Sequence, residues 1–400
     1  MIPVAEALDR ILAAFAPLPA EVVPVTGAVG RVLAADVAAR LTQPPADVSA
    51  MDGWAVRTDD IATLPATLRR IGSAPAGQPF AGTVGAGEAV RIFTGGVLPA
   101  GADTVVIQED CDDHGETVTV REGTGPGRWV RPAGLDFRAG GTMLRAGQRL
   151  TVRDVALCAA MNVPWLTVHR RPRVAILATG DEIVRPGEPI GPGQIVSSNS
   201  IALTAMVARC GGEAIDLGIA ADTHDSLKRL AAGAAGCDLL VTTGGASVGE
   251  HDLVRSALGT EGLALDFWKI AMRPGKPLMF GRFGATPMIG LPGNPVSSLV
   301  CALLFIRPAL RRMQGEDATA TLTRRARLGA PMAANDRRQD YVRAALNPGA
   351  DGLPVATAFP KQDSSMLSFL AEADCLIVRP PHAPAAAAGD LVEIVPLDDI

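Results

Sequence analysis

Residues 238–252 read DLLVTTGGASVGEHD, and this stretch decides the fold of the chain. An apolar strand pattern runs into paired glycines, then into small polar residues and acids. Glycines at 244, 245 and 249 allow positive φ and a close approach of the backbone, so successive N–H groups can converge on a phosphate where a helix begins. The pattern predicts a strand, an anion-binding loop and a helix in succession.

A second segment repeats this order. Residues 288–298, MIGLPGNPVSS, carry an apolar strand pattern into a proline-glycine turn. Asn294 can cap a helix whose first turn opens with Pro295. Ser297 and Ser298 follow in that first turn, where their hydroxyls and the backbone N–H groups can donate to a phosphate. Both segments therefore predict anion-binding loops.

Three cations lie between the two segments. Residues 267–277, FWKIAMRPGKP, contain Lys269, Arg273 and Lys276 among prolines and a glycine that favour turns. A solvated loop face would look similar, since charged residues usually face water. Their position between two anion-binding loops favours a binding role. The sequence therefore predicts a local cationic pocket in a chain whose formal net charge is −5.

Strand and helix patterns alternate between residues 173 and 312, which is typical of a parallel sheet with helices on its faces. Ligands on such sheets bind beyond the carboxyl ends of the strands, where both glycine loops fall. A polar triplet at 198–200 precedes one helix, and Ser200 is as easily a helix cap as a ligand contact. Strands are expected over 173–180, 213–220, 238–245, 263–270 and 287–293, and helices near 201–209, 226–235, 253–258 and 296–311.

The flanking regions are rich in short strand patterns. The predicted fold class is a multidomain α/β protein, with a central nucleotide-binding-like domain whose mainly parallel sheet is flanked by helices, a β-rich N-terminal region and a small C-terminal β-barrel. Apolar residues at helical spacing predict an amphipathic helix over 1–16. The expected domains are 1–45 with 140–171 as a helical linker domain, 46–139 as the β-rich domain, 172–315 as the α/β domain and 316–400 as the barrel.

Composition argues against several classes of protein. Lysine and arginine total 37 and aspartate and glutamate total 42, so the chain has no basic footprint for nucleic acid. The six cysteines form no CxxC pair and have no histidine at zinc spacing, so structural zinc is not expected. The N-terminus lacks a basic signal-peptide region, and no apolar run reaches the roughly 18 residues of a membrane span. A cytoplasmic protein with reduced, buried thiols is expected.

The glycine loop, the cationic segment and the LPGNP turn, together with SAMDGWAV at 49–56 and ATGDEIV at 178–184, resemble the molybdopterin molybdenumtransferase family. These molybdenum insertases are related to the C-terminal region of gephyrin. The similarity runs in order from Asp47 to about Arg379, and it implies a reaction in which adenylylated molybdopterin and molybdate give molybdenum cofactor and AMP. The GGxSxG element is shared with the adenylyltransferases that make this substrate, so it indicates the superfamily and not the reaction.

The resemblance implies a site at the strand ends. Cleavage of the pyrophosphate link needs a hard cation, normally Mg²⁺, held by carboxylates and phosphate oxygens. By motif position, Glu182, Asp222 and Asp252 match acids of the family's active site and are predicted as catalytic residues and metal ligands. Asp181 and Asp222 are also explained as caps of helices or turns. The implied substrate-binding set in this domain is Gly244, Gly245, Ser247, Lys269, Arg273, Lys276, Pro292, Asn294, Pro295 and Ser297.

The resemblance also assigns roles outside the α/β domain. Asp52, in a tight turn before an apolar strand, matches an aspartate that the family uses functionally and is predicted as a catalytic residue that acts across a dimer interface. Thr94 and Asp136 match loop positions of the substrate site, although turn chemistry alone accounts for such residues. Arg343 and Ser364 match polar positions associated with substrate binding, where surface strand residues would look identical.

Two other functions fit part of the sequence. The adenylyltransferase reaction needs only the α/β domain, so the N-terminal and C-terminal regions would have no role in it. A cofactor carrier or scaffold, as in the receptor anchoring by gephyrin, would bind the cofactor without turnover. The insertase is the preferred hypothesis. Its expected partners are adenylylated molybdopterin, molybdate, Mg²⁺, a second copy of the chain, the adenylyltransferase and apo-molybdoenzymes.

Overall fold

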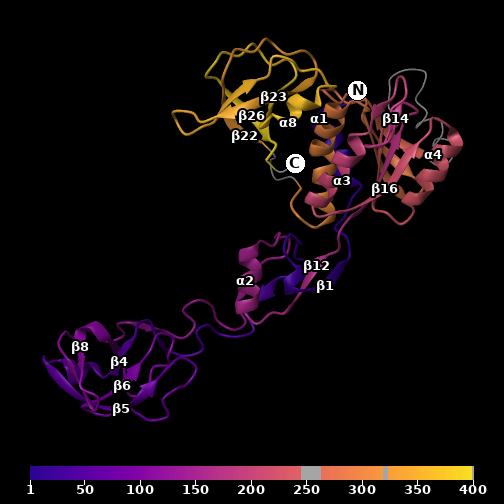
Figure 1. Cartoon of the computed structure of the whole chain (residues 1–400). Coiled ribbons are helices and arrows are strands. Elements are labelled where there is room, and N and C mark those ends of the chain that lie inside the picture. Colours follow the sequence, from indigo (N-terminus) through magenta and orange to yellow (C-terminus); the bar gives the residue numbers. More distant parts are fainter. Residues whose placement is uncertain (245–262, 319–322, 399–400) are drawn as a thin grey trace.

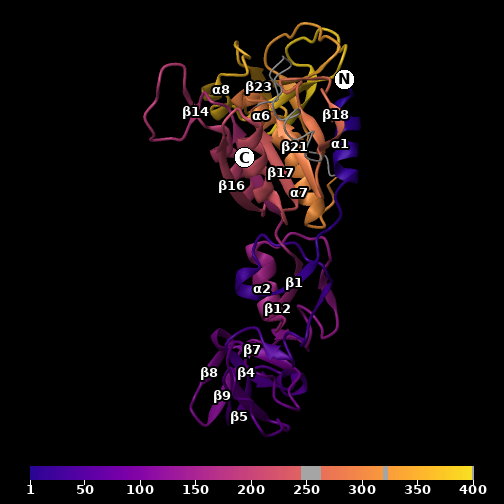
Figure 2. The same ribbon diagram turned by 90° about the vertical axis from the view of Figure 1, so that its right-hand side faces the viewer.

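The structure, a computed structural model, describes residues 1–244, 263–318 and 323–398. The molecule is elongated, and three parts follow one another along its length (Figure 1). A β-rich domain forms one end, a small module around helix α2 lies in the middle, and the α/β and C-terminal domains lie side by side at the other end (Figures 1 and 2). None of the described helices is long and apolar enough to cross a membrane.

The β-rich end domain contains a six-stranded sheet in the order β7-β4-β6-β5-β9-β8. β5 and β6 are parallel, and the other neighbours are antiparallel. Trp54 of β4 and Val118 of β9 share its core, as alternating apolar residues of half-buried strands do. The strands are β4 (Gly53–Val56), β5 (Ala66–Ala74), β6 (Glu88–Ile92), β7 (Thr104–Ile107), β8 (Cys111–Asp113) and β9 (Thr117–Val120), with a separate pair formed by β3 (Val48–Ser49) and β10 (Val130–Arg131).

The chain passes through the middle module twice. Helix α2 (Val152–Ala160) begins after Thr151, whose hydroxyl accepts from the N–H of Asp154 while the Asp154 carboxylate accepts from the N–H of Thr151. This capping box satisfies donors that the first turn leaves free. The helix shares a core with two antiparallel ribbons, which are β1 (Ala20–Pro24) with β12 (Trp165–His169) and β2 (Val37–Ala38) with β11 (Thr142–Leu144).

The α/β domain contains a six-stranded sheet in the order β16-β13-β17-β21-β20-β18. The first four strands are parallel, as the sequence predicts. The central strands β13 and β17 are nearly continuous apolar runs that are buried on both faces, as is typical of parallel sheets. The last two are antiparallel, and β20 was not expected because Gly281 and Arg282 interrupt its short apolar run. The strands are β13 (Arg173–Thr179), β16 (Glu213–Ala220), β17 (Leu239–Thr243), β18 (Leu263–Trp268), β20 (Met279–Phe283) and β21 (Thr286–Leu291).

Helices lie on both faces of this sheet. Successive β13 residues alternate between two cores, with Ile176 facing one set of helices and Leu177 facing α4. The predicted helix over 296–311 is divided by a π-helical turn at Ala302–Ile306, just before Pro308, which lacks the N–H that continues a helix. The helices are α1 (Val4–Ala13), α3 (Asn199–Arg209), α6 (Pro295–Cys301) and α7 (Arg307–Met313) on one face, and α4 (His224–Ala231) on the other.

The residues 1–45 predicted to belong to one helical linker domain lie in two separate parts of the molecule. Helix α1 buries Ala7 and Ile11 in the α/β core, whereas residues 20–38 belong to the middle module. β14 (Ile183–Val184) and β15 (Ile195–Val196) pair at the root of a loop that projects from the α/β domain (Figure 2). The helix expected at 253–258 lies outside the described residues.

The C-terminal domain is a closed barrel. Five strands pair in the cycle β23-β24-β22-β26-β25, and β25 returns to β23. β19 (Met272–Arg273), from the α/β domain, adds to β23 in parallel. The predicted small C-terminal barrel is therefore confirmed. Its elements are β22 (Arg324–Leu328), β23 (Gln339–Asn347), β24 (Val355–Ala358), α8 (Leu367–Ala371), β25 (Cys375–Arg379) and β26 (Leu391–Pro396).

Candidate active site

The carboxyl ends of the parallel strands meet at one edge of the α/β sheet. Thr179 of β13 lies beside Ala220 of β16, and Thr243 of β17 lies beside Leu291 of β21. The loops that leave this edge carry predicted residues from four separate segments, which are Glu182, Asp222, Gly244 and the Pro292, Asn294, Pro295 and Ser297 turn. Gly245, Ser247 and Asp252 lie outside the described residues.

Gly244 ends β17 in a conformation that favours glycine. Its φ is +91°, and a Cβ added there would lie 2.3 Å from the carbonyl oxygen of Thr179. The β17 loop and the β21 loop also touch, since a Cβ on Gly293 would lie 3.6 Å from the Cα of Gly244. Glycine is therefore required at 244, where the backbone of the β17 loop approaches β13.

The acids of the first two loops lie close together. The N–H of Asp222 donates to Oδ1 of Asp181 at 2.9 Å, so Asp181 supports the turn that carries Asp222. The carboxylate of Glu182 folds back over Gly180, where an added Cβ would lie 2.4 Å from it. Glu182 is exposed and Asp222 is half-buried. Within the described residues, no group of three or more acids, histidines or cysteines is arranged around a common metal position.

The LPGNP turn opens helix α6, as predicted, with Pro295 as its first residue. Asn294 occupies the N-cap position, as predicted, but its side chain accepts no bond from the helix and instead donates from Nδ2 to Oγ of Ser364 at 2.7 Å. The N–H of Val296 donates to the carbonyl of Ser364 at 3.1 Å. Ser297 is buried in the first turn. The C-terminal barrel thus supplies Ser364 to this edge of the sheet.

Arg343 of β23 is 1% exposed and lies on the opposite face of the strand from Ala344, which packs in the barrel core. Its guanidinium donates to the carbonyls of Met366 at 2.8 Å and Asp363 at 2.9 Å, and Gln362 bonds to its backbone on both sides. Burial lowers the pKa of Arg343 from its usual value. In the structure, Arg343 therefore holds the loop that carries Ser364, and its donors are committed to that loop.

The three predicted cations differ in their surroundings. Arg273 makes a bidentate ion pair with Asp340 of β23, and hydrogen bonding to Asp340 raises its pKa. Lys269 has a positive φ of +79°, and its Nζ lies 3.8 Å from the centre of the Trp268 ring. Lys276 is exposed. The charge of Arg273 is largely compensated, so the lysines carry more of the local positive field.

Asp52 and Thr94 meet in the β-rich end domain. The N–H and the hydroxyl of Thr94 donate to Oδ1 of Asp52 at 2.7 and 2.8 Å, and these bonds lower the pKa of that carboxyl. Asp136 is exposed in a loop of its own. The structure does not bring Asp52 and Thr94 to the strand ends of the same chain, because β4 and β6, which adjoin them, lie at the opposite end of the molecule (Figure 1). Asp136 precedes Phe137, which packs in the core of the middle module.

Asn199 was not among the predicted site residues. Its Nδ2 donates to Oγ1 of Thr243 and to the carbonyl of Gly293, both at 2.8 Å. The helix begins after Ser198, whereas Ser200 lies within it and pairs with the hydroxyl of Ser197. The polar triplet before a helix was the available signal, but its contacts depend on loops about 45 and 95 residues away.

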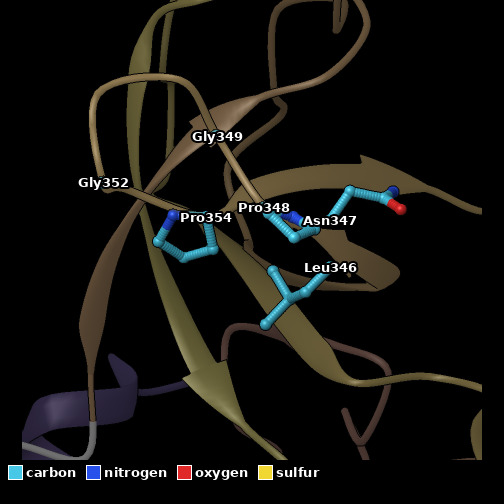
Figure 3. Close-up of a pocket in the computed structure, with 6 residues that line it drawn as sticks. All are labelled: Leu346, Asn347, Pro348, Gly349, Gly352 and Pro354. Carbon is cyan, nitrogen blue, oxygen red and sulfur yellow. The ribbon is translucent and has the colours of Figure 1, made fainter.

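A surface pocket of about 450 Å³ lies elsewhere, on the barrel hairpin between β23 and β24. Figure 3 shows Leu346, Pro348 and Pro354 around it. Its lining contains no predicted site residue and no charged side chain. It therefore does not provide the cations that would offset the charge of a phosphate or molybdate.

Comparison with known proteins places the whole chain in one family. Three family models match in succession: the MoeA N-terminal region (domain I and II) over 2–162, a probable molybdopterin binding domain over 175–312, and the MoeA C-terminal region (domain IV) over 325–397. The chain belongs to the molybdopterin molybdenumtransferase family. The family model of the central region spans Glu182, Asp222, Gly244 and the LPGNP turn, so these residues lie in the region that it describes as a probable molybdopterin binding domain.

Individual members of the molybdopterin molybdenumtransferase family match over most of their length. Molybdopterin molybdenumtransferase 2 of Mycobacterium tuberculosis is 37% identical over 93% of this chain and 94% of that protein. The molybdopterin molybdenumtransferase of Haemophilus influenzae is 33% identical over 93% of each. A crystal structure of the molybdopterin biosynthesis moea protein from Pyrococcus horikosii has a TM-score of 0.85 and 32% identity over 99% of both chains. This agreement confirms the predicted family and fold class.

Proposed function

We propose that this chain is a molybdopterin molybdotransferase that inserts molybdenum from molybdate into adenylylated molybdopterin and releases AMP. The observation that carries the proposal is the meeting of Gly244, the LPGNP turn and Ser364 at one edge of the sheet. The chain also has all three regions of a family whose curated members are named molybdopterin molybdenumtransferase.

The start of helix α6 suits the phosphates of the substrate. Within the described residues, the N–H of Val296 is taken by Ser364 and that of Ser298 by Asn294, whereas that of Ser297 has no backbone acceptor. The Ser297 N–H and hydroxyl can therefore donate to a phosphate oxygen, with the positive end of the helix favouring the negative charge. Gly244, Gly245 and Ser247 are proposed to bind the same substrate from the β17 loop.

Molybdate is a dianion that must approach a dithiolate beside a phosphoanhydride. Lys269 and Lys276 offset this repulsion in our proposal, and Arg273 contributes mainly by holding their loop against the barrel through Asp340. The sulfur atoms displace oxygen from molybdenum, and that oxygen leaves with protons as water. A carboxyl group among Glu182, Asp222 and Asp252 is proposed to manage these protons.

Mg²⁺ is the proposed cofactor. Glu182 and Asp222 are hard oxygen donors that lie at the same strand edge as the phosphate-binding turn, and Asp252 is the third proposed ligand. Because the described carboxylates do not form a group of three, phosphate oxygens would complete the coordination. When bound, the cation supplies neutralisation of the charge that develops as AMP leaves.

A homodimer is proposed because Asp52 and Thr94 lie far from the strand ends of their own chain (Figure 1). In a two-fold dimer, the end domain of one protomer can complete the site of the other. The test mixes two variants, Asp52→Asn and Ser297→Ala, that are each expected to be impaired. A shared site predicts that one of the two sites in each mixed dimer is wild type, so an equal mixture with random pairing regains about one quarter of all sites. If mixing restores nothing while heterodimers form, Asp52 acts in its own protomer or has no role at the site.

The primary test measures AMP release from adenylylated molybdopterin and Mg²⁺, with and without molybdate. Release stimulated by molybdate is expected, and removal of Mg²⁺ with a chelator should abolish it. Consumption of ATP with molybdopterin would instead identify an adenylyltransferase. Tight binding of cofactor without AMP release would identify a carrier. A cytoplasmic location and delivery of the product to apo-molybdoenzymes belong to the same proposal.

A further inference from the structure

Asn199 connects the two loops that form the proposed phosphate site. It is the first residue of helix α3, and its Nδ2 donates at 2.8 Å both to the hydroxyl of Thr243, at the end of β17, and to the carbonyl of Gly293, in the turn before α6. Thr243 also lies 3.5 Å from the hydroxyl of Ser298 in the first turn of α6, a longer and weaker link. One amide group therefore ties both sides of the site to a third element.

The geometry leaves the other half of this amide without a partner. Oδ1 of Asn199 is buried and accepts no hydrogen bond within the described part of the chain. A buried acceptor without a hydrogen bond normally lowers the stability of the folded protein, so another interaction of the same side chain must explain why it is held there. Because both donor positions of Nδ2 are used on the two loops, the tie accounts for the orientation of the side chain.

The pairing of β17 with β21 holds the two segments together as far as Thr243 and Leu291. Just beyond these strand ends, a Cβ on Gly293 would lie 3.6 Å from the Cα of Gly244, so the two backbones meet without side chains between them. Glycine loops gain close approach but lose the packing that would fix their separation. A hydrogen-bonded tie can supply what the missing side chains do not.

We propose that Asn199 is a positioning residue, which sets the separation between Gly244, just after β17, and the start of helix α6 and thereby the affinity for the phosphate-bearing substrate. The inference rests on the proposed function and adds a residue to that site. Asn199 acts through the loops and needs no contact with the substrate. Loss of the tie allows the loops to spread, and part of the binding energy is then used to draw them together.

The test disrupts the hydrogen bonds that Asn199 makes to Gly293 and Thr243, first separately and then together. Asn199→Asp keeps the size of the side chain but turns an oxygen toward the Gly293 carbonyl, which breaks that bond. Thr243→Val removes the other acceptor and leaves Asn199 intact. Asn199→Ala removes both bonds. Ile201→Ala, an exposed position on the same helix, is the matched control for changes in α3.

Each variant is assayed for AMP release, for equilibrium binding of AMP and of molybdopterin, and for thermal unfolding. Asn199→Asp and Asn199→Ala should raise KM by about threefold to tenfold. The change in kcat should stay within about twofold, because saturating substrate restores the loop arrangement. Thr243→Val should give a smaller rise, and Ile201→Ala none. In a Ser297→Ala background the effect of Asn199→Asp should shrink, since the two residues act through the same turn.

An unchanged KM and unchanged AMP affinity in folded Asn199→Asp would overturn the inference. A lower unfolding temperature with normal KM would also overturn it, because Asn199 would then be structural alone. If the wild-type protein binds AMP and molybdopterin but releases no AMP, the proposed function fails, and the inference is still decided by the binding measurements on Asn199→Asp and Thr243→Val.

Discussion

Asn294 donates to the hydroxyl of Ser364 across 2.7 Å and joins the α/β domain to the C-terminal barrel at the first turn of helix α6. The backbone N–H of Val296 bonds to the carbonyl of the same serine. The turn that the sequence marks as an anion site is thus completed by a residue from another domain. Changes in the barrel should therefore alter substrate binding as well as stability.

Arg343→Met should unfold the barrel more easily and weaken substrate binding. The change removes the donor from two partly buried hydrogen bonds, to the carbonyls of Asp363 and Met366, which is expected to cost about 2–4 kcal/mol in the free energy of unfolding. Ser364→Ala should raise KM with a stability loss of about 0.5–1.5 kcal/mol. Urea unfolding and AMP release measure both quantities. Equal stability of Arg343→Met and wild type would contradict the assigned role.

Gly244→Ala should be far more damaging than a change at a matched glycine. Both Gly244 and Gly187 have φ near +90°, but a Cβ at 244 would lie 2.3 Å from the Thr179 carbonyl, whereas one at 187 would meet nothing within 4 Å. Backbone strain alone should cost Gly187→Ala about 1–2 kcal/mol. Gly244→Ala should lose more than this in thermal unfolding, together with AMP binding. Similar losses in both variants would show that the close approach is unimportant.

The Asp52 carboxyl should titrate below its ordinary range and move upward in Thr94→Val. The N–H of Thr94 and then its hydroxyl lower the pKa of Asp52, and the variant removes the hydroxyl bond. Because the folded pKa is depressed, the stabilising contact is present above the unfolded pKa and is lost as the pH falls through the folded pKa. Thr94→Val shifts this loss to higher pH. Carboxyl carbon NMR reads the titration, with Asp363, held in the same way by Ser365, as an internal control that should not move.

Glu316→Gln should loosen the joint between the middle module and the α/β domain. Arg149, which precedes α2, makes a bidentate pair with Glu316 at 2.9 and 3.0 Å, and the Glu316 side chain is 11% exposed. Loss of the charge should lower the free energy of unfolding by about 1–3 kcal/mol. Small-angle X-ray scattering should show a broader spread of end-domain positions. Asp36→Asn breaks an exposed pair with Arg145 and should change neither property.

The sequence by itself determined the parallel core, the C-terminal barrel and the family. Buried strands such as β13 and β17 read as unbroken apolar runs, and Gly244 and Pro295 mark the loops that follow them, because these signals depend on local conformation and burial. The same local signals identified the loop residues that meet at the strand ends.

The tertiary structure alone decided which side chains meet. The side chain of Asn294 bonds to Ser364, Arg273 pairs with Asp340, and Arg343 holds the loop that carries Ser364. Asn199 gains its role from Thr243 and Gly293. Such contacts join residues tens of positions apart, and their energy depends on distance and on the water removed around them. The local sequence pattern determines neither the distance between such residues nor the water removed around them. Their pairing therefore follows from the packing of the domains.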